Sequence, residues 1–429
     1  MPVIQSLSYS EEKGDYKLSI RNTTVSFLNA VRRSLLNNVS CYAFRSEYPT
    51  EMPEKKLYQT IFETGFGIPY GTRRQFAITK NETSGFHTEV LCDRFSHTAI
   101  QHNYLHDYLQ RNQDEIGKLF FVLCHSNDIR QPLKNSDIQI QTVTEHSLRP
   151  VYIKTEDITE MEKGTELSQL DIKTDLPEPF DIQQCFPYQS DLIFLKKGEQ
   201  VHGIFEPMQG NGYLSSRFQP IVISHYSYTS HSNPDIIEDA DEHIDGVIGI
   251  EENGIMDYKE VIQRCVLSME RTLMLALDEW TKFPQSPWIQ REPSEVSDMW
   301  MFRIGFSPDI PIGDHTLAEL MNTQMTQDVR TLILELDETD SIKQELFQSC
   351  LVNAHREHPL DLNILLKIKL GKVGSYSLLD LLLIKYTGML QGRLKDLTME
   401  QKFINYLRYV TEQILDQVKQ FEMNLERIL

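Results

Sequence analysis

The chain has 429 residues, a formal net charge of −20 and a hydrophobic content of 40%. These values are typical of a folded protein with two or three domains and exclude a largely disordered chain. The sequence has no apolar run of the roughly 18 residues that a membrane-spanning helix needs, and no signal-peptide pattern follows Met1. Because an acidic surface repels phosphate groups, the charge favours protein partners over direct binding of nucleic acid.

The first predicted elements are a strand over residues 15–22 and an amphipathic helix over residues 22–39. Asn22 and Thr24 provide side-chain oxygens that can cap the helix. At about 100° per residue the apolar side chains form one broad stripe, and Arg32 falls on its margin. Its stem could lie along the stripe with the charged end in water, or its guanidinium could hold a carboxylate of a partner. The sequence leaves both interpretations open.

Three stretches are interpreted as linkers or surface loops. Residues 154–179 and 233–257 are acidic, and residues 281–297 contain three prolines, which block a continued helix or central strand. We place the major boundary in the third stretch.

Between these stretches the pattern predicts two strands around the turn Lys196–Gln200, with Gly198 in the turn. A further strand is predicted over residues 217–228, followed by a helix over residues 257–280. Apolar residues recur along that helix and give it one apolar surface.

Residues from 298 onward repeat this plan, with a strand over 299–308, a helix over 314–325 and a strand over 359–370. The C-terminal region is helical from residue 377, and its apolar residues recur at spacings of three and four, as in a coiled-coil seam. The seam residues are Phe403, Leu407, Val410, Ile414, Val418, Phe421 and Leu425. A homo-oligomeric coiled coil is one interpretation. Packing on the predicted helix at 258–280 of the same chain is the preferred one.

The six cysteines are isolated from one another, which argues against a zinc ribbon and a disulfide framework. We therefore expect free thiols in a reducing, intracellular compartment. No phosphate loop, nucleophile motif or histidine-based metal motif has its required context. His355 and His358 precede the strand that starts at Pro359 and are interpreted as part of a loop. We expect no cofactor, no bound metal and no catalytic residue.

Two helix starts share a local signature at a constant offset of 292 residues. The matching positions are Asn22, Thr24, Val25 and Leu28 in the first half and Asp314, Thr316, Leu317 and Leu320 in the second. Each start follows a predicted strand, and each half ends in a long helix. This repetition predicts two structurally related modules in one chain.

The first helix resembles a known family. The stretch IRNTTVSFLNAVRRSLLNNVSCYAF is similar to the N-terminal signature of the alpha subunit of bacterial RNA polymerase, of its archaeal counterpart and of the third-largest subunit of eukaryotic RNA polymerase II. Asn29, Val31, Arg32 and Arg33 fill the helix pattern of that family. Further along the chain, the family's turn and glycine segment are matched by Gly198, Gln200, Gly210, Gly212 and Pro220, with Glu199 as an inserted residue.

The second half resembles the eleventh subunit of RNA polymerase II and the archaeal counterpart of that subunit. The stretch GDHTLAELM is similar to that family's most diagnostic motif through Asp314, His315 and Thr316, while Ala318 and Glu319 replace a Gly-Asn pair. His358 and Pro359 match a later His-Pro pair, and residues 331–349 would be an insertion. A fusion of both partners resembles the polymerases of large DNA viruses of eukaryotes.

The resemblance implies an α+β fold in which two alpha-like dimerisation modules form an intramolecular pseudo-dimer. Residues 1–45 and 181–280 would form the first module, around an inserted β-rich domain at 46–180. A linker at 281–297 would lead to the second module at 298–429. The pseudo-dimer interface would include Phe27, Val31, Leu35, Leu317, Leu320 and Met321.

The function implied by the resemblance is that of a non-catalytic assembly platform of a multisubunit DNA-directed RNA polymerase. The platform would hold the second-largest subunit, and through it the largest, with Asn29, Arg32 and Arg33 as contacts. Small zinc-binding subunits would dock on it, without sequence-specific DNA binding, membrane attachment or a homo-oligomer. If the chain is viral, host cytoplasm or virion is expected, and the nucleus is an alternative. A coiled-coil interaction protein unrelated to transcription, or a metal-dependent enzyme, are the competing hypotheses.

Overall fold

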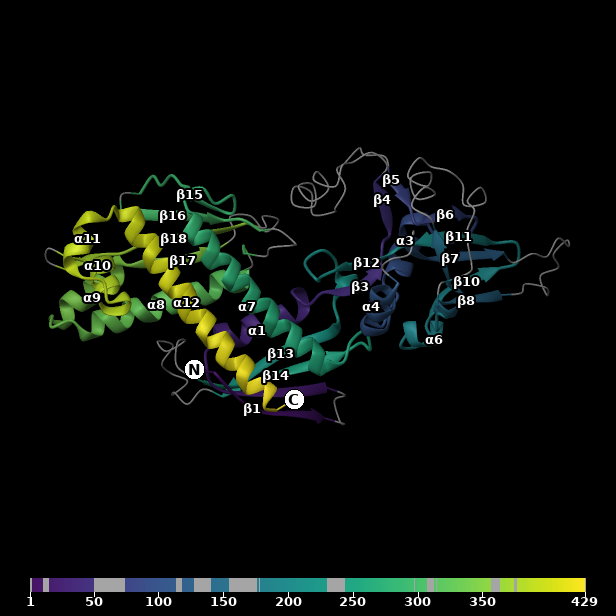
Figure 1. Cartoon of the computed structure of the whole chain (residues 1–429), viewed down its shortest axis with the longest axis horizontal. Helices are drawn as coiled ribbons and strands as arrows, with labels where there is room; N and C mark the ends of the chain where they lie inside the picture. Colours follow the sequence, from purple (N-terminus) through teal and green to yellow (C-terminus); the bar gives the residue numbers. More distant parts are fainter. Residues whose placement is uncertain are drawn as a thin grey trace. The chain divides into compact units, whose positions relative to one another are not determined.

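The structure is a computed structural model and describes residues 2–10, 15–49, 74–112, 118–126, 140–153, 176, 178–229, 244–296, 298–306, 312–313, 315–355, 363–373 and 376–428. These residues form helices and several antiparallel sheets (Figure 1), which confirms the predicted α+β class. Contacts divide the chain into two compact units. Unit 1 comprises Met1–Asn38, Ile223–Glu251 and Lys259–Leu429, and unit 2 comprises Val39–Val222 and Glu252–Tyr258. No helix in the described part of the chain is both long and apolar enough to cross a membrane.

The first sheet of unit 1 has the strand order β1–β2–β14–β13. Its strands are β1 (Val3–Ser10), β2 (Asp15–Thr23), β14 (Ile244–Glu252) and β13 (Ile221–Thr229, of which residues 223–229 belong to unit 1). β14 lies in the stretch 233–257, so the prediction of an acidic loop was wrong for that part. Its residues Ile244, Gly246 and Ile248 are buried at alternate positions, which is the strand period. Because acidic residues surround this short alternation, the composition of the stretch indicated a loop and not a strand.

A glycine in β14 brings helix α1 (Val25–Asn37) close to the first sheet. A Cβ atom at Gly246 would lie 2.3 Å from Cδ1 of Leu28, so any other residue there would force the Leu28 side chain to move. The start of α1 is capped by Thr24, whose hydroxyl accepts a hydrogen bond from the backbone N–H of Phe27 at 3.2 Å. The predicted helix and its cap by Thr24 are therefore confirmed, whereas Asn22, the other predicted capping residue, lies in β2.

The second sheet of unit 1 has the order β15–β16–β18–β17 and is antiparallel throughout. Its strands are β15 (Ile289–Glu292), β16 (Met299–Ile304), β18 (Ile364–Lys369) and β17 (Leu351–His355). β15 lies inside the stretch 281–297, so the interpretation of that whole stretch as a linker was wrong. The three prolines fall outside β15, which is an edge strand, and there they interrupt no ladder.

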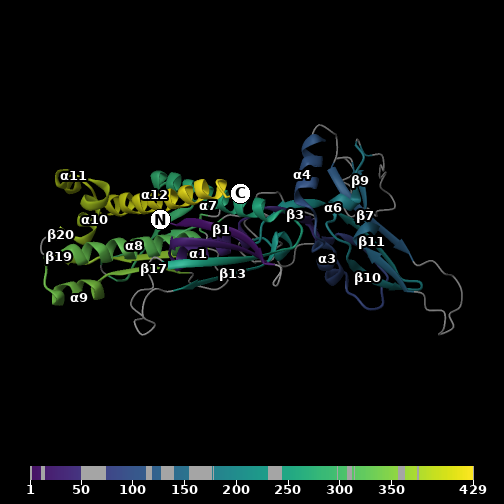
Figure 2. The same ribbon diagram turned by 90° about the horizontal axis from the view of Figure 1, so that it is seen from below.

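Six helices besides α1 complete the described part of unit 1 (Figure 2). They are α7 (Tyr258–Lys282), α8 (His315–Glu335), α9 (Asp340–Ser349), α10 (Leu378–Thr387), α11 (Gln391–Asp396) and α12 (Met399–Glu426). α8 continues ten residues beyond the predicted end at 325. The stretch 331–349, which the resemblance marks as an insertion, forms the end of α8 and α9.

The apolar seam of α12 is buried within unit 1. All seven seam residues are buried, and α12 packs on α8, α10 and β1. It also meets α7 through Lys419 and Glu270, whose charged atoms are 3.9 Å apart. The seam therefore packs within unit 1, but mainly on α8, α10 and β1 and not on the helix at 258–280 that was predicted as its partner.

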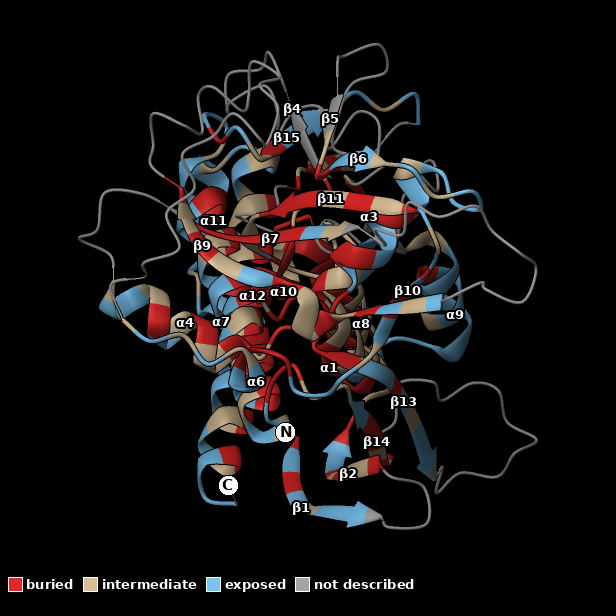
Figure 3. Ribbon diagram, turned by 90° about the vertical axis from the view of Figure 1, so that its right-hand side faces the viewer, coloured by how far each residue is buried: buried red, intermediate tan, exposed pale blue. Residues whose placement is uncertain are grey.

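The main sheet of unit 2 has the order β6–β11–β7–β9, and its central strands β7 and β11 are largely buried (Figure 3). Its strands are β6 (Ile78–Asn81), β11 (Gln200–Phe205), β7 (Lys118–Ser126) and β9 (Arg149–Ile153). Three two-stranded ladders pair β10 (Asp191–Lys196) with β8 (Ile140–Thr144), β12 (Pro207–Gly210) with β3 (Cys41–Phe44), and β4 (Glu47–Pro49) with β5 (Arg74–Phe76). The helices are α3 (Thr88–Ser96), α4 (His102–Arg111) and α6 (Ile182–Cys185).

The compact units divide the chain differently from the predicted domains. Residues 181–222 were assigned with the first module, but they belong to unit 2. The reason is that β10 pairs with β8, and β11 pairs with both β6 and β7. The two strands around Gly198 are confirmed as strands, since they span residues 191–196 and 200–205. Their alternation indicated strands but not their partners.

Candidate functional site

The site is built around α1 and α8, which pack against each other in unit 1. These helices carry the six residues that were predicted to form an interface between two modules. All six side chains are buried, with exposed fractions between 0% and 6%. They are Phe27, Val31 and Leu35 on α1 and Leu317, Leu320 and Met321 on α8.

Helix α1 contacts more than its partner α8. The ring of Phe27 meets the ring of Phe421 on α12 edge-on, with centroids 5.4 Å apart. On α7, the thiol of Cys265 donates to the backbone carbonyl of Val31 at 3.6 Å. The sheet covers Leu28 from the side of Gly246. Because four elements enclose it, α1 is a fixed support for the polar side chains on its remaining face.

Two of these polar side chains, Asn29 and Arg32, form a bridge between the helices together with Glu319 of α8. The amide nitrogen of Asn29 donates to both carboxylate oxygens of Glu319, at 3.1 and 2.9 Å. The amide oxygen of Asn29 accepts from Nε and Nη2 of Arg32, at 3.1 and 2.9 Å. Asn29 thus places its donor end toward an anion and its acceptor end toward a cation, and both contacts are charge-assisted.

A second contact lies one turn away from this bridge. The hydroxyl groups of Ser26 and Thr323 form a hydrogen bond of 2.6 Å. Ser26 and Asn29 are three residues apart on α1, and Glu319 and Thr323 are four apart on α8, so each pair lies on one face of its helix. The two contacts therefore fix the relative register of α1 and α8.

The arginines of α1 differ in their surroundings. Arg32 is half-buried, and its guanidinium is held by Asn29. Among the described residues Asn29 is its hydrogen-bond partner, a contact that neither interpretation included. A guanidinium has five N–H donors, and Asn29 uses two of them. Arg33 is also half-buried and makes no hydrogen bond or ion pair to another described residue.

The other predicted motif residues are divided among α8, unit 2 and the residues that the structure does not describe. His315 begins α8 and Thr316 is buried, while Asp314, His358 and Pro359 lie outside the described residues. Gly198, Gln200, Gly210, Gly212 and Pro220 belong to unit 2. Gly198 has a φ of +84° in the β10–β11 turn, and a Cβ atom at Gly210 would meet the ring of Phe218 at 2.9 Å. These glycines have local structural roles in their own unit.

Two residues that depart from the motifs of the family that the sequence resembles make several hydrogen bonds. Glu319 replaces an asparagine and binds Asn29. Glu199, the inserted residue, accepts from the backbone N–H groups of Ser84 and Lys196 and from the Ser84 hydroxyl. Burial would raise the pKa of Glu199, but these hydrogen bonds outweigh burial and lower the pKa.

A buried polar network in the second half of α8 was not predicted. Asp328 is 5% exposed and accepts from the hydroxyl of Tyr406 at 3.2 Å and from the amide of Gln324 at 2.9 Å. Gln324 in turn accepts from Gln417 of α12 at 3.1 Å. Burial raises the pKa of Asp328 from 3.8 to about 6, although both donors and Lys385 act to lower it. The predicted helix ended before Asp328, so its place on a buried face was not visible.

Known protein families assign no family to this chain, and metal-site geometry assigns no metal to its described residues. No protein-family model matches the chain, and no curated protein sequence has a significant match to it. Among the described residues, no group of three or more His, Cys, Asp and Glu side chains is arranged to hold a metal ion. The site thus consists of buried apolar contacts between α1 and α8 and of charged groups oriented by Asn29.

Proposed function

We propose that the chain is a non-catalytic assembly-platform subunit of a multisubunit DNA-directed RNA polymerase. The observation that carries the proposal is the packing of α1 on α8. The two helices with alpha-like motifs begin at Val25 and His315, and they meet through buried apolar residues and the Asn29–Glu319 contact. Two partners of one known heterodimer are expected to meet at these helices.

The arrangement of unit 1 supports an intramolecular pseudo-dimer. One four-stranded sheet is associated with α1 and α7, and a second four-stranded sheet is followed by α8 and α12. Each half thus has a sheet, a motif-bearing helix and a long helix. Fusion makes the pairing unimolecular, so it does not depend on the concentration of a separate partner.

The role of Arg32 in this proposal is to bind the second-largest subunit. Asn29 holds the guanidinium from one side, which lowers the conformational entropy that binding would cost. The remaining donors can engage a carboxylate or backbone carbonyls. Arg33, on the next position of α1, adds positive charge to the same region.

A pull-down with the two largest subunits from the native source tests the proposal. We expect both to copurify with the tagged wild-type chain at moderate salt. Arg32→Ala should leave the chain folded but weaken the capture of the second-largest subunit about tenfold, as is common for a desolvated arginine at an interface. Arg271→Ala on the exposed face of α7 is the matched control and should capture normally.

Two results would count against this function. Absence of both large subunits from the wild-type pull-down would remove the platform role itself. Normal capture by Arg32→Ala would remove only the assigned contact. Metal analysis of the purified chain addresses the enzyme hypothesis, because a stoichiometric metal ion would favour it over a platform.

A further inference from the structure

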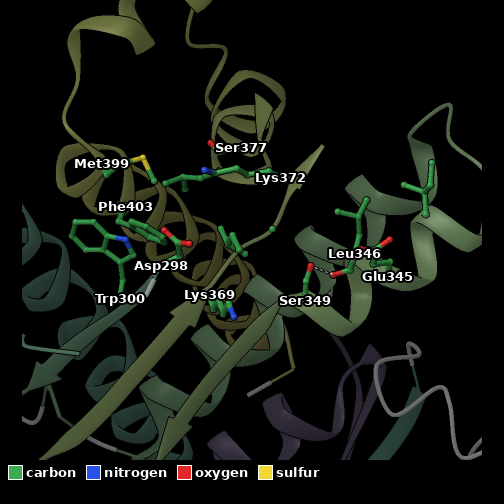
Figure 4. A pocket seen from close by; sticks show the side chains of 14 residues that line it. Asp298, Trp300, Glu345, Leu346, Ser349, Lys369, Lys372, Ser377, Met399 and Phe403 are labelled. Atoms are coloured by element: carbon green, nitrogen blue, oxygen red, sulfur yellow. Dashed lines mark hydrogen bonds between the residues drawn. The ribbon is translucent and has the colours of Figure 1, made fainter. Parts of the chain in front are cut away.

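Unit 1 contains a pocket that the α1–α8 site does not use. It has a volume of about 400 Å³ and lies among β16, β18, α9 and the start of α12 (Figure 4). This volume falls in the range of about 300–1,000 Å³ that is typical of ligand sites. None of the residues that line it belongs to α1 or α8.

The floor of the pocket is aromatic and held in place. The rings of Trp300 and Phe403 are 5.0 Å apart, and Met399 lies beside them (Figure 4). The guanidinium of Arg291 lies 4.1 Å from the centroid of the Trp300 ring, and Glu400 is 3.6 Å from that guanidinium. Since the indole is fixed by these neighbours, an apolar ligand group would meet a preformed surface.

The polar wall carries ammonium groups that have no counter-charge in contact among the described residues. Lys372 and Ser377 are cross-strand partners in the ladder of β19 (Lys372–Val373) and β20 (Tyr376–Ser377), and both line the pocket. Lys369 lines it from the end of β18. Within the described part of the chain neither lysine forms an ion pair, although each could satisfy a carboxylate.

Two carboxylates also line the pocket, at other places. Asp298 lies beside Trp300, and Glu345 is carried by α9, away from Lys372 and Ser377 (Figure 4). Neither is ion-paired with a described residue. The two carboxylates balance the charges of Lys369 and Lys372, so the lining has no net charge. The two lysines are carried by β18 and by the β19–β20 ladder, apart from Glu345 on α9. A ligand is oriented by this separation of charge.

We propose that this pocket binds a segment of a partner protein in which a large apolar side chain stands next to an acidic residue. The apolar group would lie on Trp300, Met399 and Phe403, and the carboxylate would pair with Lys372. Ile342 and Met399, which both line the pocket, are 39% and 42% exposed, so apolar surface is open to a partner here. A chain segment covers both. This inference does not depend on the polymerase function.

Methyl NMR on the intact chain tests the proposal, with the signal of Met399 as the reporter. The probes are two capped tetrapeptides that contain Phe-Glu or Phe-Lys. We expect a saturable shift of the Met399 signal with the Phe-Glu peptide and weaker binding of the Phe-Lys peptide. Lys372→Glu should reverse this preference, with a change of about fivefold for each peptide, as for an exposed ion pair. Lys395→Glu on the exposed face of α11 is the charge-matched control.

A second pair of variants separates binding from folding. Ile342→Ser should weaken both peptides, whereas Phe347→Ser, at a similarly exposed position of α9 outside the pocket lining, should not. The proposal is overturned if Met399 shows no saturable shift or if Lys372→Glu leaves the peptide preference unchanged. Tighter binding of free indole-3-acetate than of the peptide would also overturn it, because the pocket would then be a small-molecule site.

Discussion

Helix α8 carries two acidic side chains in contrasting surroundings. Glu319, near its start, is half-buried, and its two carboxylate oxygens accept from the amide nitrogen of a neutral asparagine on another helix. Asp328, in its second half, is buried, and burial raises its pKa to about 6. The first carboxylate keeps some contact with water and can select a partner at little cost. The second carboxylate is removed from water by burial, so the stability of the core around it depends on pH.

The largest expected effect concerns the pH dependence of stability. Because the folded-state pKa of Asp328 is raised, its contribution is complete below the ordinary value of 3.8 and is lost as pH rises through about 6. We expect a loss of roughly 2 kcal/mol in the free energy of unfolding between pH 4 and 7. Asp328→Asn should abolish this part of the slope. Urea unfolding can be followed by the fluorescence of Trp280, Trp288 and Trp300, which all lie in unit 1.

The control for this measurement is Asp396→Asn, at an exposed position of α11. It should keep the wild-type slope. If Asp328→Asn and the wild-type chain have the same pH slope, the buried carboxylate does not titrate in the predicted range.

The next effect concerns Tyr406, whose hydroxyl donates a hydrogen bond to Asp328. Tyr406→Phe removes the hydroxyl that donates to the carboxylate and leaves a buried oxygen without that partner. The expected loss in the free energy of unfolding is about 1–2 kcal/mol, and it should be larger at pH 7, where the carboxylate is ionised. Tyr409→Phe removes a hydroxyl that does not bind the carboxylate and should cost less. If Tyr406→Phe lowers the free energy of unfolding equally at pH 4 and at pH 7, the hydroxyl does not stabilise the ionised carboxylate.

A smaller effect is expected at the half-buried contact. Asn29→Ala and Glu319→Ala should each destabilise unit 1 modestly, and the double variant should lose less than the sum. We expect a coupling energy of about 0.5–1.5 kcal/mol from the double-mutant cycle measured by urea unfolding. A coupling energy near zero would mean that the contact between Asn29 and Glu319 contributes nothing to the packing of α1 on α8.

The smallest effect on stability is expected for Arg32→Ala. Its guanidinium is only half-buried and bonds to one described side chain, so the free energy of unfolding should change by less than about 0.5 kcal/mol. Thermal unfolding followed by circular dichroism checks this. A large loss would show that Arg32 stabilises the fold itself, and the role proposed for it in binding would lose its support.

The sequence predicted the elements better than their pairing. α1 was predicted together with its cap because Thr24 and the apolar period are local signals. The buried positions Leu317 and Leu320 were expected from the resemblance and from the signature shared with the first helix. β14 was missed because acidic neighbours masked a short alternation. The assignment of residues 181–222 to unit 2 could not be predicted from the sequence. The reason is that strand partners are set by contacts between residues far apart in the chain.

The polar parts of the site were the hardest to predict. Arg32 was singled out by its position on the margin of an apolar stripe, and the structure places it beside Asn29. Glu319 was noted only as a departure from a family motif, because its partner is 290 residues away in the chain. Asp328 gave no signal, since a single acidic residue within a helix is usually exposed.

The position of β14 between β2 and β13 has a consequence for synthesis on the ribosome. Asn22, at the end of β2, donates a hydrogen bond to Asp245 of β14, which is 223 residues later in the chain. The continuous segment Val39–Val222 of unit 2 leaves the ribosome before β14 does, so that segment can begin to fold first. The apolar face of α1 must wait for α7 and α8 to emerge. The nascent N-terminus is therefore the part of this chain that most needs protection from early association.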